Sequence, residues 1–135
     1  NIPGVSSMNW EDLKVIGYIN GKAEIERKYL KNPTFKELEI TADDKEINSI
    51  NEGSAWDSTR ITIKAVDSWG NRLPYINEAI NIEVKGAGEL IGNDNPVLEG
   101  GYYSFWVKTS TKKGIIKITI SNKRVESKSI EIKVK

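Results

Sequence analysis

Carboxylates and amines are the side chains of this 135-residue chain that could do acid or base chemistry, because it contains no cysteine and no histidine. Without these two residue types, disulfides, thiolate nucleophiles, Cys/His zinc sites, haem ligation by either residue and His-dependent triads are excluded. Paired acids remain at Glu11-Asp12 and Asp43-Asp44. Adjacent acids in polar stretches are typical of turns, so no catalytic residue is assigned from them.

A second candidate for a functional site is the segment Asn93-Asp94-Asn95, whose oxygen atoms could suggest a calcium loop. The segment lacks the alternating ligand spacing and the distal glutamate of an EF-hand. Turn geometry also accounts for it, together with Gly92 and Pro96. We therefore expect no metal site, and no cofactor is implied.

Aromatic rings are the remaining candidates for binding, because a flat ring can pack on the C–H face of a sugar while polar neighbours bond its hydroxyls. Trp69 falls in a predicted turn, Trp56 in a polar loop, and Tyr102 and Trp106 share one face of a predicted strand. These four residues are candidates for contact with a sugar or a neighbouring domain. From position alone, Trp69 is expected to be the most exposed and Trp106 to be buried or interfacial.

The elements that must position these residues alternate apolar and polar side chains, which is typical of half-buried strands. In each of five segments, three apolar residues fall on one face. The sets are Leu38, Ile40, Ala42; Ile61, Ile63, Ala65; Ile80, Ile82, Val84; Ile116, Ile118, Ile120; and Ile130, Ile132, Val134. With turn residues between them, the pattern predicts an all-β, immunoglobulin-like antiparallel β-sandwich of about seven strands.

A β-hairpin is predicted before the sandwich. Two strand-like runs, 13–19 and 22–30, flank Asn20-Gly21, the strongest short signal for a two-residue hairpin turn. Pro33 then ends the pairing, since it has no N–H. Residues 1–32 are interpreted as the final hairpin of a preceding domain or as an N-terminal extension, although packing within the sandwich stays open. Residues 33–135 form the sandwich domain, and we expect the chain to be a piece of a longer protein.

Charge and hydropathy exclude two classes of partner. Lys plus Arg number 20 and Asp plus Glu number 19, for a formal charge of +1. This balance gives no reason to expect binding to nucleic acid, and no apolar run approaches the roughly 20 residues of a membrane span. The basic C-terminal region is interpreted as a solvated sheet face. The abundance of isoleucine and lysine suggests a bacterial origin.

Several segments resemble known modules. Residues 61–74, ITIKAVDSWGNRLP, resemble the strand and Gly-Asn turn of bacterial immunoglobulin-like modules, which occur in adhesins and in family 2 glycoside hydrolases. Residues 82–92, 95–97 and 100–109 are similar to a run in the C-terminal domains of the β-galactosidases of that family, as is the strand 113–120. Residues 12–22, DLKVIGYINGK, resemble the last hairpin of the sandwich domain that precedes this one in those hydrolases.

The resemblance implies a non-catalytic C-terminal β-sandwich domain of a family 2 β-galactosidase, whose parent enzyme would hydrolyse terminal β-galactosides. That family's two catalytic glutamates stand on a separate (β/α)₈ barrel, and no motif here matches them. The implied partners are neighbouring domains of the same polypeptide, a second subunit or a carbohydrate. Two alternatives stay open, a cell-surface spacer repeat of the adhesin type and a carbohydrate-binding module.

Overall fold

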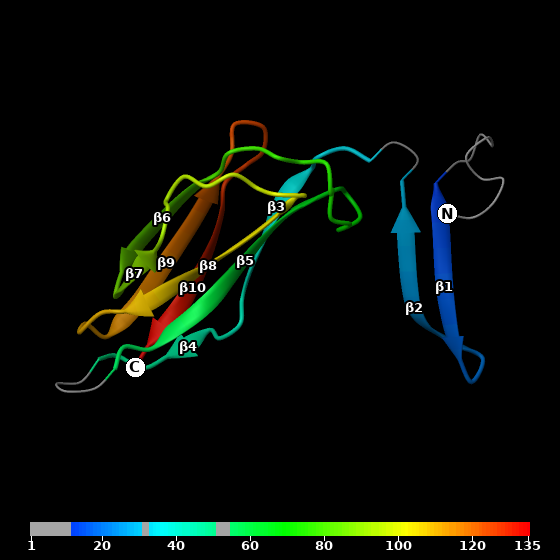
Figure 1. The fold of residues 1–135 in the computed structure, drawn as a ribbon. Helices are drawn as coiled ribbons and strands as arrows, with labels where there is room; N and C mark the ends of the chain where they lie inside the picture. The colour runs from blue at the N-terminus through cyan, green and yellow to red at the C-terminus, as the bar shows by residue number, and fades with distance from the viewer. Residues whose placement is uncertain (1–11, 31–32, 51–54) are drawn as a thin grey trace.

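The hairpin is the first element of the chain. The computed structural model describes residues 12–30, 33–50 and 55–135. Strands β1 (Leu13–Ile19) and β2 (Lys22–Tyr29) pair antiparallel, and Figure 1 shows them standing beside the sandwich. Asn20 and Gly21 have φ angles of 51° and 77°, the positive values that a type I′ turn needs at both central positions. The predicted hairpin and its turn are confirmed.

Two four-stranded sheets form the sandwich (Figure 1). One has the order β3-β5-β8-β7 and the other the order β4-β10-β9-β6. Neighbouring strands run antiparallel, apart from the short β4, which is parallel to β10. The strands are β3 (Glu37–Ala42), β4 (Glu46–Ile47), β5 (Ser58–Val66), β6 (Asn81–Gly86), β7 (Gly88–Ile91), β8 (Tyr102–Thr109), β9 (Gly114–Ser121) and β10 (Lys128–Val134).

This strand order is the immunoglobulin arrangement. If β4 is set aside, the first, second, fifth and fourth strands make one sheet, and the third, sixth and seventh make the other, as in constant-type domains. The predicted fold class is therefore confirmed. The described residues contain no helix, and so none that could cross a membrane.

The core lies between the two sheets and is built from the predicted alternating residues. Ile61 and Ile63 of β5 are completely buried, as are Ile116, Ile118 and Ile120 of β9. Ile40, Ala42, Val84 and Ile130 pack against this cluster but stay partly exposed. Because side chains alternate along a strand, the residues between the buried ones point to the outer faces of the sandwich.

Backbone hydrogen bonds hold the segment between β5 and β6 against the end of β5 and against Gly101, just before β8. The Leu73 N–H donates to the Ala65 carbonyl, and the Gly101 N–H donates to the Ile76 carbonyl. Gly101 has a φ of 70°, and a Cβ atom there would lie 2.1 Å from the Leu73 carbonyl oxygen. Only glycine fits where the backbone of residue 101 meets that of Leu73, a contact that we call the crossing. The crossing fixes where the turn after β5 leaves the sandwich.

We expect Gly101→Ala to destabilise the sandwich more than Gly70→Ala. Both glycines have positive φ, but a Cβ at Gly70 would meet no atom within 4 Å. Gly70→Ala therefore carries only the left-handed backbone strain, about 1–2 kcal/mol, whereas Gly101→Ala adds a backbone clash. Urea unfolding of the two variants measures the difference, and equal midpoints would show that the crossing tolerates a side chain.

Candidate functional site

The turn after β5 is organised by the buried carboxylate of Asp67, which is 2% exposed. One oxygen of Asp67 accepts hydrogen bonds from the backbone N–H groups of Trp69 (2.8 Å) and Asn71 (3.0 Å). The Asp67 N–H in turn donates to the Asn71 carbonyl at 3.0 Å. These bonds satisfy a buried charged group that would otherwise be costly. Asp67 therefore shapes the turn.

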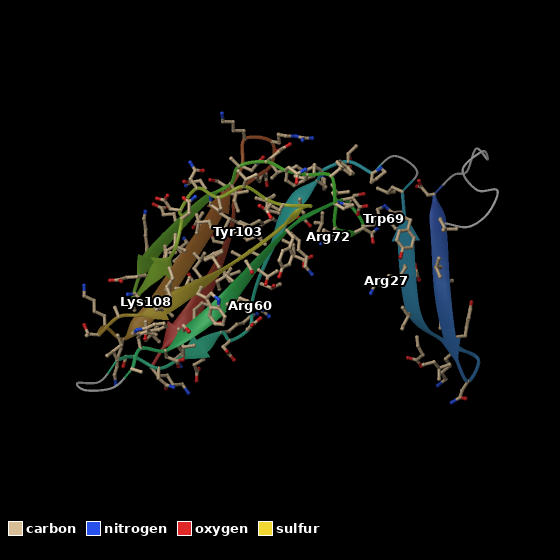
Figure 2. The ribbon with its side chains drawn as sticks, viewed as in Figure 1. Arg27, Arg60, Trp69, Arg72, Tyr103 and Lys108 are labelled. Carbon is tan, nitrogen blue, oxygen red and sulfur yellow. The ribbon has the colours of Figure 1, made fainter. Side chains whose placement is uncertain are left out.

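This turn contacts the hairpin. The side-chain amide of Asn71 donates to the backbone carbonyl of Lys28 in β2. The Lys28 ammonium lies 4.3 Å from the centre of a Trp69 ring, within the range of a cation–π interaction. The Tyr75 hydroxyl donates to the Pro33 carbonyl at 2.8 Å, just beyond the hairpin. Figure 2 shows Trp69 lying against β2. We refer to the contacts of Trp69, Asn71 and Tyr75 with Lys28 and Pro33 as the junction.

Ion pairs on one face of the hairpin lie beside the junction. Glu26 forms ion pairs with Lys14 and Lys28, each at 3.4 Å. Partial desolvation alone would raise the pKa of Glu26, but the hydrogen bonds and charges of Lys14 and Lys28 outweigh it and hold the pKa below its usual range. These ion pairs favour the folded hairpin above the pKa of a free glutamate and are lost as the pH falls. A surface hollow of about 510 Å³ lies here, lined by Glu26, Lys28, Ser68 and Trp69.

The opposite face of the hairpin carries exposed apolar side chains together with the charged Arg27, which stands across from Val15. By the strand register, Leu13, Val15 and Ile25 lie on the face opposite Lys14, Glu26 and Lys28. Their exposed fractions are 50%, 48% and 59%. A two-stranded hairpin with so little buried apolar surface is marginally stable by itself.

The four aromatic candidates are not gathered in one place. Trp69 is at the junction, Trp56 lies in the segment before β5, and Tyr102 and Trp106 point outward from β8. The expected order of exposure was wrong: Trp56 and Trp106 are 52% and 47% exposed, whereas Trp69 is 42% exposed. The Lys28 ammonium lies over a Trp69 ring, and no local pattern in the sequence indicates this contact. Trp106 is about half exposed rather than buried among the described residues.

Two of the acids singled out in the sequence take part in local structure, Asp43 through its carboxylate and Asp44 through its backbone. Asp43 pairs with Arg60 at 3.1 Å, and the Asp44 N–H donates to the Thr59 hydroxyl at 2.9 Å. Asn93 accepts a hydrogen bond from the Asn95 N–H at 2.9 Å, which is a local turn. Glu11 lies outside the described residues. Within the described ranges, no three His, Cys, Asp or Glu side chains are grouped so that they could hold a metal ion.

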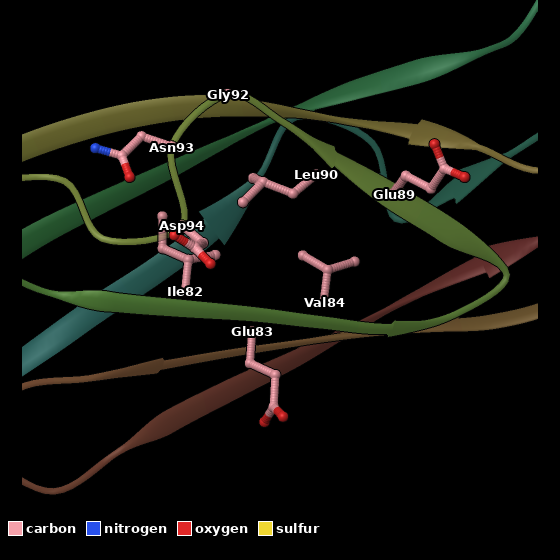
Figure 3. A pocket seen from close by; sticks show the side chains of 8 residues that line it. All are labelled: Ile82, Glu83, Val84, Glu89, Leu90, Gly92, Asn93 and Asp94. Carbon is pink, nitrogen blue, oxygen red and sulfur yellow. The ribbon is translucent and has the colours of Figure 1, made fainter.

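The largest hollow that we describe, about 710 Å³, is an open notch between the edge strands β6 and β7 (Figure 3). Ile82, Val84 and Leu90 point between the two strands, whereas Glu83 points away. Glu83 and Glu89 pair instead with Lys85 (3.0 Å) and Lys108 (3.3 Å). The notch is thus the open side of the sandwich core, and its acids do not converge on a common point.

The junction partners were not among the residues selected from the sequence. Lys28 and Pro33 contact the turn largely through backbone carbonyls, which carry no signature of residue type. Asn71 could have been found, since the Gly-Asn pair marked the turn, but its second partner lies 43 residues away. The junction positions the hairpin and offers no pair of converging catalytic groups.

A family model matches most of the sandwich. Residues 38–131 match the glycoside hydrolase family 2 C-terminal domain 5. A β-galactosidase of Thermoanaerobacterium thermosulfurigenes is 39% identical over 98 residues, which cover 73% of this chain and 13% of that protein. A β-galactosidase of Thermoanaerobacter pseudethanolicus is 35% identical over 131 residues, covering 95% of this chain and 17% of that protein.

Solved structures have the same fold. A glycosyl hydrolase family 2 member from Bacteroides cellulosilyticus superposes with a TM-score of 0.73 at 21% identity, over 93% of this chain and 17% of that chain. Matches of this extent reach into the hairpin, because residues 33–135 are only about three quarters of the chain. The chain spans less than a fifth of the length of these relatives.

Family membership thus rests on agreement between the sequence of the sandwich and its fold. The turn at Asp67, the crossing at Gly101 and the alternating core strands all lie inside the matched residues. The chain belongs to glycoside hydrolase family 2 and carries that family's C-terminal domain 5 over residues 38–131.

Proposed function

We propose that this chain is the C-terminal part of a β-galactosidase and acts there as a non-catalytic scaffold. The β-galactosidase relatives support the identity of the parent enzyme. The junction is the observation that carries the scaffold role, since it joins two structural units through specific contacts. The hydrolysis of terminal β-galactosides would then take place elsewhere in the parent polypeptide.

The acids of the described residues support a non-catalytic role. A retaining glycosidase needs two carboxyl groups about 5–5.5 Å apart on either side of the scissile bond. Here Asp67 caps a turn, Asp43 pairs with Arg60, and Glu78 pairs with Arg124. Each of these carboxylates is engaged in holding the sandwich together.

The exposed side chains of the hairpin support the scaffold role further, because a partner outside the described residues could bury them. On one face of the hairpin, Leu13, Val15 and Ile25 are about half exposed. Burial of apolar area contributes roughly 25 cal/mol per Å², so covering this face would stabilise the hairpin. We propose that the domain preceding residue 12 in the parent polypeptide covers it, as the length of the relatives allows.

The junction would then set the angle between that preceding domain and the sandwich. The Asn71 side-chain amide donates a hydrogen bond to the Lys28 backbone carbonyl, and the Trp69 ring packs against the Lys28 ammonium. Tyr75 holds Pro33, where the chain leaves the hairpin. Three contacts at separate points restrain the rotation of the hairpin relative to the sandwich more than any one of them. The linker between the two then holds them at one angle, and we call this arrangement the fixed corner.

The rigidity of this corner is testable by a distance measurement between two spin labels. The chain has no cysteine, so Lys22→Cys and Lys112→Cys would be the two labelling sites. One label would then stand at the hairpin turn and the other on the sandwich. Double electron–electron resonance should give a narrow distance distribution in this background. Adding Trp69→Ala and Asn71→Ala should broaden it, because both Lys28 contacts are lost.

Trp56→Ala is the matched control, since it removes an exposed tryptophan away from the junction. It should leave the distribution narrow. A broad distribution without the junction substitutions, or equal broadening in the control, would refute the fixed corner. Unchanged amide spectra of β8 and β9 would show that the sandwich remains folded in all variants.

The non-catalytic assignment has a simpler test. The purified 135-residue chain should release no nitrophenol from nitrophenyl β-galactoside above the buffer rate, because the carboxylates of Asp67, Asp43 and Glu78 are engaged in a turn and in ion pairs. A parent-type β-galactosidase in the same assay is the positive control. Hydrolysis that follows the chain through purification would contradict the assignment.

A further inference from the structure

The outer face of the β3-β5-β8-β7 sheet is a candidate for binding that the scaffold role leaves unused. Its inner face carries Ile61, Ile63, Phe105 and Val107, all buried. The residues that alternate with them point outward. The junction contacts come from the turn after β5 and from Tyr75, so none of these contacts uses the outer face.

The strand register arranges the outward side chains in rows across the sheet. In one row Trp106 of β8 stands between Ile91 of β7 and Arg60 of β5. Four residues away along β8, Tyr102 stands opposite Lys64 of β5. At a rise of about 3.4 Å per residue, the two aromatic positions are roughly 13 Å apart.

Short hydroxyl side chains fill the space between these two rows. Ser104 of β8 is opposite Thr62 of β5, and Thr62 is opposite Thr41 of β3. Each hydroxyl can both donate and accept a hydrogen bond. The face therefore alternates between aromatic rings and hydroxyl groups at intervals of two residues.

The charges around the central row are balanced. Arg60 pairs with Asp43 at 3.1 Å, and Lys108 pairs with Glu89 at 3.3 Å. Glu39 and Lys64 also stand opposite each other on this face, so acidic and basic side chains are interspersed and no single sign of charge would select an ionic ligand. A neutral partner that carries many hydroxyl groups is complementary to such a surface.

We propose that this face binds a neutral oligosaccharide. The Trp106 ring, 47% exposed, would pack against the C–H face of one sugar ring. Ser104 and Thr62 would hydrogen-bond the hydroxyls of the next sugar, and Tyr102 would bound the site at its far end. The separation of the two aromatic positions suits a short chain of sugars better than a monosaccharide. The site is separate from the junction, so it can fail while the scaffold role stands.

The test is an NMR titration of the 135-residue chain with β-1,4-galactotetraose and cellotetraose, following the indole N–H signals and the amides of β5 and β8. Saturable shifts should centre on Trp106 at millimolar sugar. Trp106→Ala should weaken binding by about tenfold or more, which corresponds to ~1.4 kcal/mol of lost contact. Trp69→Ala is the matched control and should bind as the unmodified chain does.

Three results would overturn the proposal. The first is the absence of saturable shifts with either tetrasaccharide. The second is binding that is equally strong in Trp106→Ala. The third is concentration-dependent broadening of the β5 and β8 amides without sugar, which would assign the face to a second copy of this chain. Unchanged sandwich amide spectra would establish that Trp106→Ala is folded.

Discussion

The turn that follows β5 depends on one interaction, the acceptance of two backbone N–H groups by the buried carboxylate of Asp67. It sets the positions of Trp69 and Asn71, and both of these residues contact the hairpin. The glycine crossing at Gly101 sets where the same segment lies on the sandwich. The orientation of the hairpin therefore follows from the interior of the sandwich, although the contacts themselves are at the surface.

The chain has two regions with different physical demands. The sandwich buries the apolar faces of its own strands, as the fully buried Ile116, Ile118 and Ile120 illustrate. The hairpin leaves Leu13, Val15 and Ile25 about half exposed, and the proposed function assigns their cover to the preceding domain. In the proposed arrangement the junction end of the sandwich serves the parent polypeptide, and the outer face with Trp106 is left for a ligand.

The strands were predictable because their signal is local. Alternation at Ile61, Ile63 and Ala65 reports burial on one face, and Asn20-Gly21 reports the positive φ values of its turn. Which strands become neighbours is not local, so the number and spacing of the strands predicted the immunoglobulin-like class without the individual strand pairs. The order of tryptophan exposure was wrong because it depends on Lys28, which is distant in the sequence from Trp69. Contacts through backbone carbonyls, such as that of Pro33, leave no trace in residue type.

Native-state amide hydrogen exchange tests most directly whether the hairpin and the sandwich are separate units coupled through the turn. The account predicts that amides of β1 and β2 open with much lower free energy than those of β9, because the hairpin buries little apolar surface. It also predicts that Trp69→Ala lowers protection in the hairpin and leaves β9 unchanged. Equal protection of hairpin and sandwich, falling together in the variant, would contradict the account.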